Sequence, residues 1–137
     1  MKRYTLNFKG YWRECNKGGV PSESGIYLVY RCMYNQESKT VSLKELIYIG
    51  QSRDVKTRLA THTKLEEFKN VCMPGETLCY SFAQVNENDL DLVENALIFA
   101  QKPRLNHALY DEYNHDSASF ELIGRCSLMK YTNFKIS

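Results

Sequence analysis

Residues 25–50 read GIYLVYRCMYNQESKTVSLKELIYIG, and the prediction of the fold starts from this stretch. Its first part, GIYLVYRC at 25–32, and its last part, LIYIG at 46–50, are rich in β-branched and aromatic side chains, which favours two strands. The polar residues 33–45 between them predict a long loop. The two strands are therefore expected to pair as a hairpin.

This hairpin is expected to bring two phenols together. Alternation along a strand places Tyr27 on the face opposite Ile26, and it turns Tyr48 away from Ile47 and Ile49. Tyr27 and Tyr48 can then lie near one another on the sheet. Tyrosine is common in strands and usually serves only for packing, so this pair by itself predicts no function.

A helix is expected to follow the hairpin, from about Asp54 to about Phe68. Arg58 and His62 are four positions apart, so they would project from one face of that helix. Together they could hold a phosphate and handle a proton. The alternative is a solvated helix surface, which is the usual fate of such residues.

The most informative residue lies in a second helix, expected over residues 88–101. Leu90, Leu97 and Ile98 form an apolar stripe along this helix, and Glu94 lies inside the stripe. A carboxylate in that position points toward the protein body, where it needs a partner. The partner is either a buried arginine, a hydrogen-bond donor or a metal ion.

Further strands are expected at 77–85 and 120–123, with a short one around 4–8. A chain of 137 residues suits one domain. The order of the central elements, β, β, α, β, α, predicts an α/β fold. We expect a small sandwich in which helices flank a short central antiparallel-type sheet of about three strands.

The net charge is only +2, but the charges are unevenly distributed. Residues 1–18 carry five Lys and Arg against one acid, and residues 124–137 carry three with no acid, so the body between them is acidic. Two interpretations remain open. The basic ends are either solvated tails or contacts for phosphates, and we expect them to supply much of the phosphate contact with DNA.

The cysteines predict a reducing compartment. Their number is five, no C-x-x-C pair occurs and no signal peptide precedes them, so we expect free thiols in a cytoplasmic protein and no zinc site. No apolar stretch approaches the length of a membrane span, so no membrane partner is expected. The cysteines are Cys15, Cys32, Cys72, Cys79 and Cys126.

Taken together, these motifs resemble the GIY-YIG nuclease family. Gly25-Ile26-Tyr27 and Tyr48-Ile49-Gly50 match the two tripeptides that name the family, and the segment 102–106 resembles its closing Pro-x-x-Asn motif. One tripeptide would be a weak signal, whereas six positions in the right order are a specific one. The six are Tyr27, Tyr48, Arg58, His62, Glu94 and Asn106.

The resemblance covers about residues 23–107, which implies a catalytic domain over that range. Residues 1–22 are then a basic N-terminal extension, and residues 108–137 a C-terminal extension packed on or beside the domain. His62 matches a histidine of the restriction-endonuclease branch. Gln51 stands where the excision-repair branch has lysine, which argues against that branch.

The resemblance implies a metal-dependent endonuclease that hydrolyses phosphodiester bonds of DNA. Tyr27 would take the proton from water and Tyr48 would orient the water or a phosphate oxygen, although these roles could be exchanged. His62 would accept the proton from Tyr27 or hold its hydroxyl in place. Arg58 would stabilise the charge of the transition state.

The same resemblance implies that Glu94 is the metal ligand. One carboxylate with waters and phosphate suits Mg²⁺, with Mn²⁺ as a substitute. No second carboxylate joins Glu94 in the matching positions, and Asp91 is interpreted as a helix residue that suits the dipole. Asn106 would position the backbone or Glu94.

Double-stranded DNA is the expected partner, and a chain this small would have to dimerise or act twice to cut both strands. The role stays open between restriction, a phage or mobile element, and repair. The alternative function is a catalytically inactive nucleic-acid-binding module of the same fold. Retention of all six positions argues against that alternative.

Overall fold

The computed structural model describes residues 1–137, which form one sheet and several short helices. The strands are β1 (Lys2–Arg13), β2 (Gly25–Asn35), β3 (Thr40–Ser52), β4 (Thr77–Gln84), β5 (Ala118–Gly124) and β6 (Asn133–Ile136). The helices are α1 (Val55–Ala60), α2 (Leu65–Asn70) and α3 (Leu90–Gln101), with the 3-10 segments η1 (Glu14–Gly19) and η2 (Glu87–Asp89).

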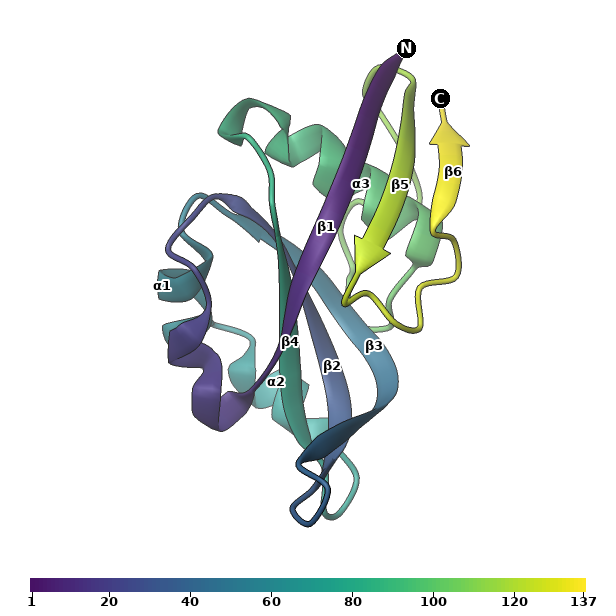
Figure 1. Ribbon diagram of the computed structural model, residues 1–137. Coiled ribbons are helices and arrows are strands. Elements are labelled where there is room, and N and C mark those ends of the chain that lie inside the picture. The colour runs from purple at the N-terminus through teal and green to yellow at the C-terminus, as the bar shows by residue number, and fades with distance from the viewer.

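The six strands form a single mixed sheet in the order β3-β2-β4-β1-β5-β6, which curls into a half-barrel (Figure 1). The expected sandwich around about three antiparallel strands is therefore wrong. Strands account for 40% of the residues and helices for 24%, so the sheet dominates the molecule. The error arose at the two ends of the chain, which both add strands to the sheet.

The N-terminal segment is a sheet strand, because its apolar residues alternate. Leu6 and Phe8 are buried in the core, whereas Lys9 is exposed. β1 pairs antiparallel with β4 and parallel with β5, from Lys2 opposite Ala118 onward. The parallel partner lies more than a hundred residues away in the sequence, and no local pattern announces such a pairing.

The central hairpin is longer than expected. β2 and β3 pair from Gly25 opposite Ser52 as far as Asn35 opposite Thr40, so the segment expected as a loop is mostly strand. Two irregularities in register interrupt the pairing, one of them between Val29 and Tyr30. The bulges interrupt the alternation of side chains, and the outer parts of both strands are polar, so the sequence there has no apolar run that would indicate a strand.

The helices cover opposite faces of the sheet, and each face has its own core. On one face, residues of α1 and α2 pack with Tyr27 and Tyr80 in a cluster of 11 buried residues. On the other, α3 packs against Ile26 and Leu28 in a cluster of 21. The chain from β2 to α3 follows the predicted element order except that two short helices, α1 and α2, replace the first expected helix, and the complete sheet differs from the expected one.

The helix expected from Asp54 to Phe68 is broken in the middle. α1 ends at Ala60, and the following residue, Thr61, has a φ of −133° and a ψ of 41°, which are not helical. The backbone N–H of Lys64 donates to Nδ1 of His62 at 3.0 Å, so a side chain satisfies a group that a continuous helix would pair with backbone. His62 thus lies in a turn and not on the helical face of Arg58.

Two of the cysteines form a disulfide, so the expectation of five free thiols is wrong for that pair. Cys32 on β2 and Cys79 on β4 are joined across neighbouring strands, although 47 residues separate them in the sequence. Cys15, Cys72 and Cys126 are free. None of the helices has the length and apolar character needed to cross a membrane.

Candidate active site

The two phenols lie on the same face of the central hairpin, with ring centroids 6.3 Å apart. Tyr27 is fully buried opposite Gly50, and the half-buried Tyr48 lies opposite Val29 two pairs further along. Tyr48 also packs against Phe68 of α2, at a centroid distance of 5.0 Å. The structure therefore brings together the two tyrosines that the hairpin was expected to juxtapose.

The glycines of the two tripeptides are explained by close packing. A Cβ atom at Gly50 would overlap Cζ and Oη of Tyr27, and a Cβ atom at Gly25 would overlap the backbone oxygen of Ala83. Neither neighbour can yield easily, because one is a rigid ring in the core and the other is sheet backbone. Gly50 therefore makes the space in which the phenol of Tyr27 lies.

His62 contacts the hydroxyl of Tyr27. Its Nε2 lies 2.6 Å from the Tyr27 oxygen, and its Nδ1 accepts the backbone N–H of Lys64. Burial, followed by the positive charge of Arg58, lowers the pKa of His62 to about 4, so the imidazole is neutral at pH 7. With Nδ1 as acceptor, the single proton is on Nε2, and His62 donates to the oxygen of Tyr27.

The phenols of Tyr27 and Tyr48 are protonated at neutral pH. Burial raises the pKa of Tyr27 and of Tyr48 above the ordinary value, whereas the charge of Arg58 lowers both. The side chain of Arg58 is exposed and forms no salt bridge or hydrogen bond within the chain. Its guanidinium group is therefore available to an anion placed beside Tyr27 and Tyr48.

The half-buried carboxylate of Glu94 accepts a hydrogen bond from the side chain of Gln51. Nε2 of Gln51 donates to Glu94 at 2.9 Å and also to Asp91 at 2.7 Å. Burial raises the pKa of Glu94, and the neighbouring charge of Asp91 raises it further, whereas the hydrogen bond from Gln51 lowers it. No arginine pairs with this carboxylate, so a buried ion pair does not account for it.

The residues around Glu94 fit a hard cation. Two carboxylates converge on one amide nitrogen, so their oxygens already face a common positive pole. Oxygen ligands of this kind suit Mg²⁺ or Mn²⁺. Glu94 and Asp91 would hold the ion, and the amide of Gln51 would turn away or offer its oxygen. No group of three or more His, Cys, Asp or Glu residues is gathered in the structure, so waters and substrate would complete the coordination.

Asn106 contacts backbone and not Glu94. Its side-chain oxygen accepts the N–H of Ile49 at 3.0 Å, and its amide donates to the Ile49 carbonyl at 2.9 Å. The next anchor is Leu105, whose N–H donates to the carbonyl of Ile47. The segment after α3 is thus pinned to β3 on both sides of Tyr48, which holds that residue in place.

Sequence reasoning missed Gln51 and Asp91. The sequence marks Gln51 only as a departure from the excision-repair branch, and the place of Asp91 in the first turn of α3 suits the helix dipole. The signal for Asp91 was its spacing, because residues three apart on a helix share a face and Asp91 precedes Glu94 by three. Gln51 could not be linked to either, since 40 or more positions separate it from them.

No protein-family model, curated protein or solved structure matches the chain. The chemistry of the site is therefore judged from its geometry. The site combines an exposed cation, a phenol bonded to a neutral imidazole, and two carboxylates around one donor. These groups can bind a phosphate, hold a divalent cation and accept or donate one proton.

Proposed function

We propose that this protein is a metal-dependent endonuclease of the GIY-YIG type that hydrolyses DNA phosphodiester bonds. Water would attack the phosphorus and give one proton to the Tyr27 phenolate, the bond from phosphorus to the 3′ oxygen would break, and the departing 3′ oxygen would take up a proton from solvent. The observation that carries the proposal is the contact between Tyr27 and His62, 2.6 Å long, beside the unpaired Arg58.

Tyr27 is the proposed proton acceptor, and His62 is a positioning residue that acts through it. A phenol accepts a proton only as phenolate, which burial opposes in this protein. The Nε2–H of His62 points at the phenol oxygen and stabilises the phenolate by a hydrogen bond. To accept the Tyr27 proton at Nε2, His62 would have to carry its own proton on Nδ1 instead. The backbone N–H of Lys64 donates to Nδ1 and therefore opposes that tautomer. Of the two roles expected for His62, holding the hydroxyl is therefore favoured.

Arg58 is proposed to stabilise negative charge on the phosphoryl oxygens. It is exposed, it has no partner in the chain, and its charge reaches both phenols. Glu94 and Asp91 would hold Mg²⁺ or Mn²⁺, which supplies Lewis-acid stabilisation of the leaving oxygen when bound. Tyr48 would orient the attacking water, and Asn106 holds the strand that carries Tyr48.

The test is cleavage of a long DNA of known sequence with purified protein and Mg²⁺, followed by sequencing of the product ends. The expected result is cutting that stops in chelator and in the Glu94→Gln variant. Absence of cutting by the parent under all divalent cations, with DNA binding retained, would favour the inactive binding module instead. The product ends would also report sequence specificity and whether one or both strands are cut.

A further inference from the structure

A polar groove borders the site on the side of α1. It encloses about 390 Å³ and is lined by seven residues, none of them hydrophobic. It begins at the end of β3 with Ser52 and Arg53, follows one side of α1, and ends at Thr61 and Thr63, which flank His62. Arg58 belongs both to this groove and to the surroundings of the two phenols.

Most of the polar groups in the groove are already bonded within the protein. The hydroxyls of Ser52, Thr57 and Thr61 donate to neighbouring groups of the chain. The carboxylate of Asp54 caps α1 by accepting the N–H and the hydroxyl of Thr57. The hydrogen bonds hold Asp54 in place but leave its negative charge, so the lining carries two arginines against one acid and a net charge of +1.

Three donors remain without a partner. The guanidinium groups of Arg53 and Arg58 and the hydroxyl of Thr63 are exposed, and none of them bonds to another group of the protein. Two guanidinium groups and a hydroxyl are the donors that proteins use against phosphate oxygens. All three line the groove that an anion would occupy.

The local charge supports this reading. Residues 52–64 hold four cations, Arg53, Lys56, Arg58 and Lys64, against one acid, Asp54. Residues 19–123 have a net negative charge as a whole, but the segment 52–64 beside the site is basic. A DNA backbone would be attracted to this segment and repelled elsewhere on the body.

The geometry points to this groove as the binding site for the sugar-phosphate backbone next to the scissile phosphate, with Arg53 and Thr63 contacting a phosphate that is not cut. This assignment rests on the proposed function in one respect, namely which phosphate is the one that is cut. Because Arg58 is shared, a strand lying in the groove places its next phosphate beside Tyr27 and Tyr48. Arg53 then positions substrate without touching the reacting atoms.

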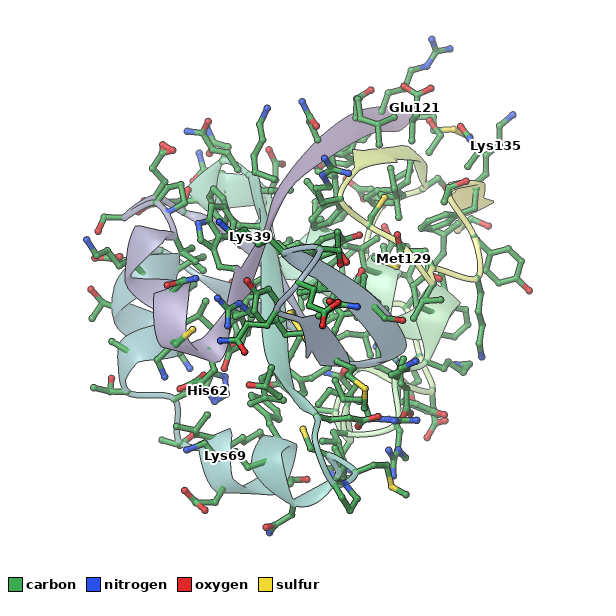
Figure 2. The ribbon with its side chains drawn as sticks, turned by 60° about the horizontal axis from the view of Figure 1, so that its bottom comes forward. Lys39, His62, Lys69, Glu121, Met129 and Lys135 are labelled. Carbon is green, nitrogen blue, oxygen red and sulfur yellow. A yellow bond between two sulfur atoms is a disulfide. The ribbon has the colours of Figure 1, made fainter.

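The basic ends of the chain are less well placed for the same task. His62 and Lys135 lie on opposite sides of the molecule (Figure 2), and the start of β1 lies beside β5 and β6, away from α1 and α2 (Figure 1). Lys2 is also engaged with Asp116 at 3.7 Å. Arg3 and Lys135 are exposed cations on that remote part of the sheet, so they provide matched controls for Arg53.

The experiment measures binding of a fluorescent DNA duplex over a range of salt, with Ca²⁺ in place of Mg²⁺ to separate binding from cutting. Arg53→Gln is expected to weaken binding about tenfold at low salt and to flatten the slope of log K against log salt by about one. Thr63→Val should weaken it about threefold with the slope unchanged, since it removes a neutral donor. Arg3→Gln and Lys135→Gln should leave affinity and slope close to the parent.

Two results would overturn the assignment of the groove as a binding site for the DNA backbone. One is an Arg53→Gln curve that overlays the parent, and the other is an equal loss in the Arg3→Gln and Lys135→Gln controls. Because binding is measured without cutting, a parent that binds but never cleaves would reject the nuclease proposal and leave the groove supported. A parent that cleaves while Arg53→Gln binds normally would reject the groove alone.

Discussion

Nε2 of His62 lies 2.6 Å from the hydroxyl oxygen of Tyr27, and the backbone N–H of Lys64 occupies the other ring nitrogen of His62. The imidazole is thereby held in one tautomer by a turn that ends α1. The phenol receives a hydrogen bond and keeps its own proton free for another partner. The break in the expected helix is what creates this arrangement.

The first prediction concerns the two phenols. Tyr27→Phe keeps the packing volume and removes the hydroxyl, so it should lower kcat at least about a hundredfold if Tyr27 is the general base. Tyr48→Phe should also lower kcat. The check is single-turnover cleavage at saturating protein, with thermal melts to show that both variants are folded. Wild-type rates in both variants would show that the phenols only pack.

The second prediction is the pH dependence of cleavage. Because His62 is neutral above its pKa of about 4, the profile should show no inflection near the ordinary histidine pKa of about 6.5. The rate should rise with pH as the phenolate fraction of Tyr27 grows. The measurement is log kcat against pH in the parent and in His62→Gln. An inflection near pH 6.5 in the parent that vanishes in the variant would assign proton transfer to His62.

His62 also predicts a stability window. Its folded pKa of about 4 is below the unfolded value of about 6.5, so the unfolded state binds more protons between them. The contribution to stability is complete above about pH 6.5 and is lost as pH falls toward 4. Urea titrations across this range should show a smaller decline in His62→Gln than in the parent. Parallel declines would place His62 in solvent.

The fourth prediction separates metal binding from folding. Burial raises the pKa of Glu94, so the folded protein becomes less stable as pH rises from the ordinary carboxyl pKa through the raised value. Glu94→Gln should abolish cleavage, keep DNA binding, and melt at a higher temperature than the metal-free parent at pH 7. Mg²⁺ should raise the Tm of the parent and not that of the variant. Undiminished cutting by Glu94→Gln would reject the metal assignment.

The fifth prediction tests the space at Gly50. A methyl group there overlaps the ring of Tyr27, so Gly50→Ala should cost about 1–3 kcal/mol of stability and remove most activity. Adding Tyr27→Val to Gly50→Ala empties the overlapped space, and this double variant should recover part of the stability but no cleavage. Additive losses in the double variant would mean that the clash lies elsewhere.

The sequence by itself determined the local elements around the site. Alternation and β-branched content indicated strands at Gly25 and at Leu46, and the apolar stripe indicated a helix carrying Glu94. These signals are legible because each depends on residues only a few positions apart. The same patterning placed Tyr27 and Tyr48 on one face of a hairpin, and the structure confirms that placement.

Only the tertiary structure decided the extent of the sheet and the partners of the site residues. β1 lies between β4 and β5, His62 turns out of its helix toward Tyr27, and Gln51 joins Asp91 to Glu94. The strand pairing and the contacts of Gln51 join segments that are distant in the sequence. The turn at His62 replaces a backbone hydrogen bond of the helix by a hydrogen bond to a side chain. Their free energies depend on the whole packed chain, so no window of the sequence contains them.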